Sequence, residues 1–404
     1  MTTSTATPPI FLLGMLALPP AVFALTTGPL GTLMPLSALV WLVAARRRPS
    51  LAVLLRDPWV LLMLAIGVLG LASAGWALDP RLAAAKSAFF LATVVPLSLM
   101  VVGSTPPPDE RARRWLLAGL AVGTALLVVQ THGGFLLRDV LGGGNRLHPE
   151  HKLNVPAAGI AIACWLAPLA SQGLSRLWQW LALLLVLGGG WVAAASDGSA
   201  PVLGWLVGGA VLLAGRWSPR LVAVGLALGL LVAQFVAPRL GGIDFMQSQI
   251  EDRNARIRMD IWQLADDLGK DRPWLGYGFS NSREIPERPY SLPLTGKHAK
   301  LPLYPHNVLL EARLELGLPG MLLLHGCWWL LLWRAVQLAS WQRATALALL
   351  AAGMAVWCVG YPLWRSAWLA WLFYVGLGFV SLLQPARTSD SSQPASRAPT
   401  IGMP

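Results

Sequence analysis

The sequence is short of charged residues. Asp, Glu, Lys and Arg make up only 12% of its 404 residues, whereas a soluble domain carries about 25%. It also has only three cysteines, Cys164, Cys327 and Cys358, all in apolar runs without metal-ligand spacing. These absences exclude a typical soluble enzyme, a disulfide framework and a zinc knuckle.

Signatures of several other classes are missing too. There is no P-loop, no dinucleotide-binding fingerprint and no His, Asp and Glu cluster with metal-ligand spacing. The net charge of +12 comes from short basic clusters between apolar runs, with no basic stripe interleaved with aromatics. We therefore expect no nucleic-acid partner, no bound metal and no cofactor.

Long apolar runs dominate what is present. Hydrophobic residues make up 55% of the chain and the mean hydropathy is +0.57. A helix needs about 20 apolar residues to cross a bilayer. About twelve such spans can be counted, near residues 10–27, 29–45, 58–76, 84–103, 115–131, 155–171, 177–195, 200–215, 220–237, 318–336, 342–361 and 364–384. The sequence predicts an all-α polytopic membrane protein.

Basic residues mark every second connection. They lie in "ARRRP" (45–49), "PPPDERARR" (106–114), around Arg176, in "GRWSPR" (215–220) and at Arg334 and Arg343. The positive-inside rule makes these connections cytoplasmic, and with them both termini. The predicted organisation is nine spans over residues 1–237, a periplasmic loop over 238–303, three spans over 304–384 and a disordered cytoplasmic tail over 385–404.

The long loop has a helical pattern within it. It carries ten Lys or Arg and nine Asp or Glu. Between residues 251 and 269, Ile257, Ile261, Leu264 and Leu268 recur at spacings of three and four. This periodicity predicts an amphipathic helix in a folded extracytoplasmic subdomain, and long loops often carry function.

"YPHNVLLEARLELGLPG" (304–320) follows the loop. Pro305 favours a helix start, and a helix N-terminus disfavours a protonated imidazole, so His306 is expected to be neutral and is the candidate general base. The alternative is an interfacial histidine held by a carbonyl or a lipid headgroup. Asn307 and Glu311 lie four residues apart and share a helix face, where Glu311 could accept a bond from Asn307 or pair with an arginine. The alternative is a structural cap and pair.

A second polar cluster lies in "EDRNARIRMDIWQLADDLGKDRPWLGYGFSN" (251–281). Arg258 and Trp262 share a helix face, and Arg253 and Arg256 lie one turn earlier. Arginine suits bidentate phosphate binding, and Trp262 suits the membrane interface; the alternative is a solvated, salt-bridged helix. The turn-rich end of this stretch, with Tyr277, is expected to bend back toward the membrane.

Three more places carry polar side chains near spans. Lys86 lies at the edge of one, where an ionisable group is either functional or extends to the interface. Asp197 in "SDGSAP" and His148 in "NRLHPEHKLN" are weaker candidates, and for His148 a plain loop position is favoured.

Taken together, "RMDIW" (258–262), "DRPWLGYG" (271–278) and "PHNVLLEARLELGLPG" (305–320) resemble the O-antigen ligase family of bacterial membrane glycosyltransferases. "WALDPRLAAAK" (76–86) is similar to an early periplasmic loop of that family. One departure is Ser196-Asp197-Gly198, where the family often has Ser-Arg-Gly. Asp197 cannot inherit the phosphate-binding role of that arginine.

The resemblance implies a glycosyltransferase type C-like enzyme of the bacterial inner membrane, with its active site facing the periplasm. Its donor would be an undecaprenyl-diphosphate-linked glycan, transferred with inversion and without a metal or nucleotide sugar. His306 would be the base and Arg258, with Lys86, Arg253 and Arg256, would bind the diphosphate. Asn307, Glu311, Tyr277, Trp262, His148 and Asp197 would support the site or the acceptor.

Within the family we favour a ligase that uses lipid A–core as acceptor. One dominant loop argues against a polymerase, and the short sequence after the last span argues against a protein O-oligosaccharyltransferase. A transporter or flippase, or a scaffold, remains the alternative from another class. A transporter predicts repeat symmetry and polar groups near the midplane, whereas here the polar groups gather at one membrane face.

Overall fold

The computed structural model describes residues 10–44, 52, 55–104, 109–133, 153–196, 198–242, 253–286, 288–291, 298–299 and 304–383. His148, Asp197 and the predicted tail at 385–404 lie outside these residues. At Arg253 the backbone is described but the side chain is not.

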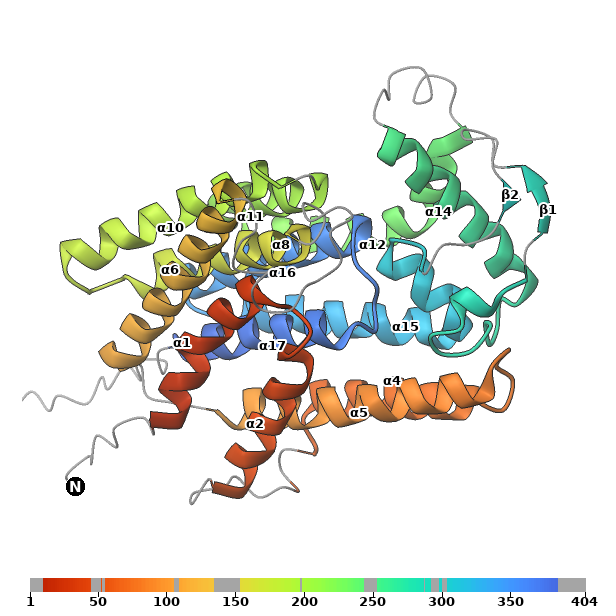
Figure 1. Ribbon diagram of the computed structural model, residues 1–404, viewed down its shortest axis with the longest axis horizontal. Coiled ribbons are helices and arrows are strands. Elements are labelled where there is room, and N and C mark those ends of the chain that lie inside the picture. Colours follow the sequence, from red (N-terminus) through yellow and green to blue (C-terminus); the bar gives the residue numbers. More distant parts are fainter. Residues whose placement is uncertain are drawn as a thin grey trace, which may run out of the picture.

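Each of the twelve predicted spans corresponds to a helix (Figure 1). They are α1 (Ile10–Leu25), α2 (Leu30–Ala44), α4 (Pro58–Ser73), α5 (Pro80–Gly103), α6 (Glu110–His132), α8 (Asn154–Ala163) continued by a 3-10 turn (Cys164–Leu166) and α9 (Ala167–Ala170), α10 (Arg176–Ala194), α11 (Ser199–Trp217), α12 (Pro219–Val236), α15 (Val308–Val336), α16 (Ser340–Val359) and α17 (Ser366–Val380).

Seven of these helices are long and apolar enough to cross a membrane, namely α5, α6, α10, α11, α12, α15 and α16. The other five are apolar but only 10–17 residues long. The chain is thus a multi-pass membrane protein, as predicted. The number of crossings stays a prediction, because length alone does not qualify all twelve.

The scarce acidic residues begin several of these helices. Asp57 accepts a hydrogen bond from the backbone N–H of Trp59 at 2.8 Å, and Asp79 accepts one from that of Leu82 at 2.9 Å. Proline follows each aspartate, at the first helical position. A capping carboxylate satisfies a first-turn N–H that has no partner in the helix, so these local sequences fix where α4 and α5 begin.

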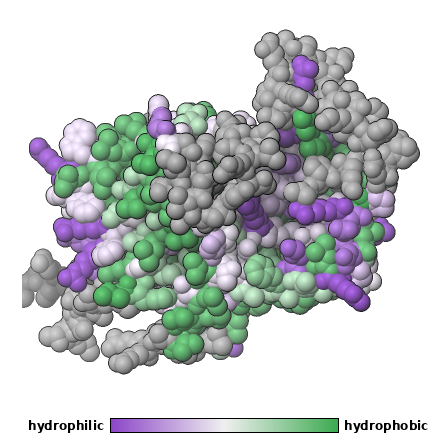
Figure 2. Space-filling model, viewed as in Figure 1, coloured by the Kyte–Doolittle hydropathy of each residue, from purple (hydrophilic) through white to green (hydrophobic). Residues whose placement is uncertain are grey.

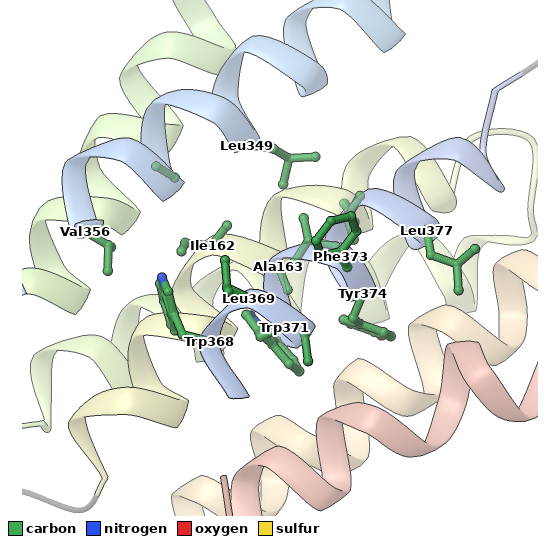
Figure 3. Packing of buried hydrophobic residues seen from close by; sticks show 14 of the residues in the cluster. Ile162, Ala163, Leu349, Val356, Trp368, Leu369, Trp371, Phe373, Tyr374 and Leu377 are labelled. Atoms are coloured by element: carbon green, nitrogen blue, oxygen red, sulfur yellow. The ribbon is translucent and has the colours of Figure 1, made fainter. Parts of the chain in front are cut away.

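The core centres on α17. Trp368, Trp371 and Tyr374 are fully buried and lie among side chains of α8, such as Ile162, and of α16, such as Val356 (Figure 3). In contrast, large apolar side chains remain exposed along α10 and α12. Figure 2 shows apolar residues over much of one face, with hydrophilic residues gathered toward its left and right ends. This distribution suits a belt in contact with lipid.

Contacts between connections divide them into two groups. In one group, the Asp79 N–H donates to Asn281 Oδ1 at 2.6 Å, and the Tyr361 hydroxyl donates to the Asn154 carbonyl at 2.7 Å. All of these residues lie in or beside connections predicted to be periplasmic. These connections therefore gather at one end of the molecule.

The second group joins connections predicted to be cytoplasmic. Arg334, in the last turn of the tenth span, pairs with Asp57, which follows the second span, at 2.9 Å. Arg216 lies 4.2 Å from the ring centroid of Trp341. The alternation of connections between two ends agrees with the predicted topology, whereas the compartment that each end faces stays a prediction.

The loop between α12 and α15 folds onto one end of the helices (Figure 1). After a 3-10 turn at Ala237–Gly242, it contains α14 (Arg253–Asp271), a 3-10 turn at Ser282–Glu284 and two antiparallel strands, β1 (Arg288–Ser291) and β2 (His298–Ala299). The amphipathic helix is confirmed within two residues of its predicted ends. The strand pair departs from an all-α fold, and Arg288 precedes a proline, which favours extended backbone.

Candidate active site

The predicted amphipathic helix packs on the start of α15. Ile261, Leu264 and Leu268 are buried in one cluster with Leu310 and Leu314 of α15. The apolar positions at spacings of three and four therefore form the buried face of α14, and this packing fixes the helix against the first turns of α15.

An ion pair closes the same interface. Arg313 Nη1 lies 2.5 Å from Asp266 Oδ1, and Lys270 Nζ lies 2.9 Å from Asp266 Oδ2. Partial burial raises the pKa of Asp266, but its bonds to Lys270 and Arg313 outweigh that effect and hold the pKa below its usual value. Part of the charge on α14 is thus structural, as the salt-bridged alternative expected.

The segment that follows α14 turns back onto α15, as predicted, and replaces hydrogen bonds that α15 cannot make. Pro319 has no N–H to donate to the Glu315 carbonyl, and that carbonyl accepts instead from Gly278 N–H at 2.8 Å. The Leu314 carbonyl accepts from Tyr277 N–H at 3.0 Å. Leu318 N–H donates to the Pro273 carbonyl at 2.9 Å. The motifs at 271–278 and 305–320 are therefore joined backbone to backbone.

Glycine is required at this junction. Gly317 kinks α15 with φ 63° and ψ −153°, and a Cβ there would lie 2.3 Å from the Trp274 carbonyl oxygen. Gly276 also has a positive φ, of 65°, and a Cβ there would lie 2.5 Å from the Glu315 carbonyl carbon. Only a residue without a side chain allows both backbones to approach this closely.

Glu315, which was not among the residues predicted from the sequence, joins α15 to two other segments, residues 280–282 and the α16–α17 connection. Its buried carboxylate accepts hydrogen bonds from Ser280 N–H at 2.6 Å, from the Ser282 hydroxyl at 2.6 Å and from Trp364 Nε1 at 2.5 Å. Its position four residues after Glu311, on the same helix face, was the signal that could have found it.

Glu311 also binds a distant segment. It is buried, and its Oε2 accepts from the backbone N–H of Leu363 at 2.9 Å. Asn307 caps α15, with Oδ1 accepting from Leu309 N–H at 3.0 Å and from Leu310 N–H at 3.3 Å. The expected side-chain bond between Asn307 and Glu311 is therefore replaced by a helix cap and by a bond to the α16–α17 connection.

His306 lies just before this cap, not inside the helix as the proline suggested. Its backbone is left-handed, with φ 57°, and its Nδ1 lies 3.1 Å from the Gly360 carbonyl oxygen. Because a carbonyl only accepts, Nδ1 carries the proton and Nε2 keeps its lone pair. The half-buried ring lies 4.3 Å from that of Tyr304.

The surroundings of His306 keep it neutral. Burial lowers its pKa most, and the positive charge of Arg258 lowers it further, while the bond to Gly360 acts in the opposite direction. This direction agrees with the predicted neutral imidazole, but its causes are burial and a neighbouring charge.

Arg258 and Trp262 share one face of α14, as predicted, and line a cavity of about 510 Å³ between α14 and α11. Arg258 Nη1 donates to the Ser199 hydroxyl at 3.1 Å. The other lining residues are Val202, Leu203, Leu206, Ala255, Met259 and Val359. Trp262 is buried there, so it contributes to packing and not to a lipid-facing surface. The cavity is a largely apolar groove with one guanidinium.

The remaining predicted residues are not gathered at His306. Lys86 is exposed on α5 and makes no hydrogen bond or ion pair with any residue that the structure describes. Arg256 is half-buried in the first turn of α14. Tyr277 is buried, and its hydroxyl lies 3.3 Å from the Leu268 carbonyl oxygen, so it supports the turn after α14.

Comparison with known proteins identifies the family over the region that contains these features. Residues 181–325 match the family described as O-Antigen ligase. This match covers α11, α14 and the first part of α15, and therefore includes Arg258, His306, Glu311 and Glu315.

Relatives point the same way. Three Rickettsia proteins that bear the name "Putative polysaccharide ligase" are similar to this chain. That of R. conorii is 26% identical over 238 residues (56% of each chain), that of R. felis 29% over 182 (43% of this chain, 44% of the relative) and that of R. prowazekii 29% over 143 (32% and 33%). The chain spans about half the length of the first two. The resemblance seen in the motifs is confirmed: this polytopic membrane protein carries an O-antigen ligase domain at residues 181–325.

Proposed function

We propose that the protein is a lipopolysaccharide O-antigen ligase. It transfers a glycan from undecaprenyl diphosphate to a sugar hydroxyl of lipid A–core at the periplasmic face of the bacterial inner membrane. The family match over the described site supports glycan transfer. The choice of lipid A–core as acceptor follows from the single dominant loop in the sequence.

The observation that carries the proposal is the state of His306. Its Nδ1 donates to the Gly360 carbonyl oxygen, and burial, together with the charge of Arg258, lowers the pKa of the ring. Nε2 is therefore a base whose position and tautomer are both fixed. Such a base at the start of a membrane helix suits an acceptor and a donor that are both anchored in lipid.

The transfer then proceeds in one displacement. The acceptor hydroxyl gives its proton to His306 Nε2, and its oxygen forms a bond to the anomeric carbon of the donor. The bond from that carbon to the bridging phosphate oxygen breaks, and undecaprenyl diphosphate leaves with the electron pair. Attack opposite the leaving group inverts the anomeric configuration.

The groove beside Arg258 suits the donor. A guanidinium binds phosphate oxygens in a bidentate manner, and positive charge stabilises the leaving diphosphate as its charge develops. The apolar side chains of Val202, Leu203 and Leu206 continue from Arg258 along α11. They offer a surface for the first isoprene units while the diphosphate remains at the guanidinium.

Transfer by the purified protein tests the proposal. The protein in nanodiscs receives a lipid-linked glycan and, in separate reactions, lipid A–core, a second lipid-linked glycan or a Ser/Thr peptide. We expect a product only in the reaction that contains lipid A–core as acceptor. The His306→Gln variant should give no product in that reaction. Product only with the second glycan indicates a polymerase, and product only with the peptide a protein transferase. Movement of intact donor across the bilayer without transfer indicates a flippase.

A further inference from the structure

The short connection between α16 and α17, residues 360–365, is held firmly at the candidate site. The Gly360 carbonyl accepts from His306 Nδ1, and the next residue, Tyr361, donates its hydroxyl to the Asn154 carbonyl at 2.7 Å. The Tyr361 ring also lies 4.6 Å from that of Trp368 in α17. The first half of this connection is thus fixed to three separate elements.

Two buried carboxylates of α15 hold its second half. Glu311 accepts from Leu363 N–H at 2.9 Å, and Glu315 accepts from Trp364 Nε1 at 2.5 Å. The same helix begins directly after His306. The position of residue 365 is therefore set relative to His306 by hydrogen bonds on both sides of the connection.

Arg365 follows these anchors directly. Its side chain is exposed, makes no capping bond at the start of α17 and forms no hydrogen bond or ion pair within the described part of the chain. The predicted topology places it at the outer ends of the spans, where the positive-inside rule gives basic residues no orienting role. Neither local structure nor topology accounts for this arginine.

The positive charges of Arg365 and Arg258 both favour ionisation of the Tyr304 and Tyr361 hydroxyl groups. Burial raises the pKa of Tyr304 and of Tyr361, and the charges of both arginines act against that rise in each case. Tyr304 lies against the His306 ring. Val359, which directly precedes Gly360, lines the same cavity as Arg258, so the connection that ends at Arg365 begins beside this cavity.

We propose that Arg365 binds the donor diphosphate together with Arg258 and supplies the positive charge that the family resemblance expects at position 197, where this chain has an aspartate. The inference rests on the proposed function. It is supported by chemistry, because a diphosphate presents two groups of anionic oxygens and two guanidiniums can each bind one of them.

Direct binding measurements test this role. The full chain in nanodiscs is titrated with undecaprenyl diphosphate, undecaprenyl phosphate and undecaprenol, using the wild type, Arg365→Ala and Arg365→Lys. Arg176→Ala is the control, because Arg176 is an exposed arginine in the first turn of α10, at the end predicted to be cytoplasmic. We expect Arg365→Ala to weaken diphosphate binding about 10- to 100-fold, as for loss of a charged hydrogen bond.

Further expected results separate binding from folding. In Arg365→Ala, the affinity for undecaprenyl phosphate should fall less than the affinity for undecaprenyl diphosphate, while undecaprenol binding and the melting temperature stay unchanged. Arg365→Lys should restore part of the lost affinity. Arg176→Ala should bind all three ligands as the wild type does. An unchanged Kd for the diphosphate in Arg365→Ala overturns the inference, as does an equal loss for undecaprenol. If the wild type binds the diphosphate but transfers no glycan, the proposed function is wrong. The Kd values of the Arg365 variants still test whether Arg365 binds the diphosphate.

Discussion

His306 Nδ1 lies 3.1 Å from the carbonyl oxygen of Gly360, fifty-four residues later in the chain. This bond leaves Nε2 unprotonated, and burial lowers the pKa of the ring, with the Arg258 charge adding to the effect. The neutral, active form therefore predominates above a pKa lower than about 6.5. The proposed base is lost as the pH falls through that value.

The pH dependence of transfer tests this assignment. In the wild type we expect kcat to fall on the acidic side with an apparent pKa below 6.5. His306→Gln should lose about 10²- to 10⁴-fold in kcat and with it the acidic limb. His306→Asn separates backbone strain from chemistry, because Asn tolerates the positive φ of this position. Near-normal turnover in either variant would mean that another group is the base.

Removing the guanidinium of Arg258 should abolish transfer. Its Nη1 bonds the Ser199 hydroxyl in the groove, and a lysine would offer a point charge without the planar fork, so Arg258→Lys should rescue poorly. Arg176→Ala is the control, since Arg176 is an exposed arginine in the first turn of α10. Initial transfer rates, with melting temperatures beside them, distinguish the variants. Full activity of a folded Arg258→Ala variant would show that Arg258 does not take part in transfer.

Glu315→Gln should loosen the outer end of the protein. The amide keeps one acceptor oxygen but cannot accept from Ser280, Ser282 and Trp364 together. Leaving buried donors unpaired costs about 1–3 kcal/mol each. Trp364→Phe removes a single donor and should cost less. Thermal unfolding and proteolysis near residue 280 measure both, and an unchanged melting temperature in Glu315→Gln would contradict the anchor role.

Gly317→Ala should be severely destabilising, because a Cβ would lie 2.3 Å from the Trp274 carbonyl oxygen and the backbone has a positive φ. Left-handed strain alone costs about 1–3 kcal/mol. Gly225→Ala in α12 is the matched control, since a Cβ there meets nothing within 4 Å. Yield of folded protein and melting temperature should fall for Gly317→Ala only. Equal melting temperatures of the two variants would contradict the close approach of Gly317 to the Trp274 carbonyl.

Membrane orientation can be tested by thiol labelling from outside the cell. The three native cysteines lie in or at the ends of helices, and Cys164 and Cys327 are buried. Glu284→Cys and Ser218→Cys place exposed thiols in two connections predicted to face opposite sides. An impermeant reagent should label position 284 only. Ser282 would be a poor position, because it is buried against Glu315. Labelling at position 218 but not at 284 would show that the predicted orientation is inverted.

Several features followed from local sequence. The apolar runs predicted the helices, because both the length and the hydropathy of a span lie within one continuous segment. The spacing of Ile261, Leu264 and Leu268 gave the buried face of α14 for the same reason. The motifs around Arg258 and His306 also gave the family, now supported by the match over residues 181–325.

The partners of the polar residues came from the tertiary structure alone. Asn307 caps its own helix, whereas Glu311 and Glu315 accept from Leu363 and Trp364 about fifty residues away. No sequence pattern encodes such pairs, since they arise only when separate helices pack and their buried polar groups must find partners. The sequence by itself indicated a multi-pass membrane protein that resembles the O-antigen ligase family, and it predicted a candidate base. Packing decided that His306 bonds the carbonyl oxygen of Gly360, because this bond joins segments that meet only in the folded chain.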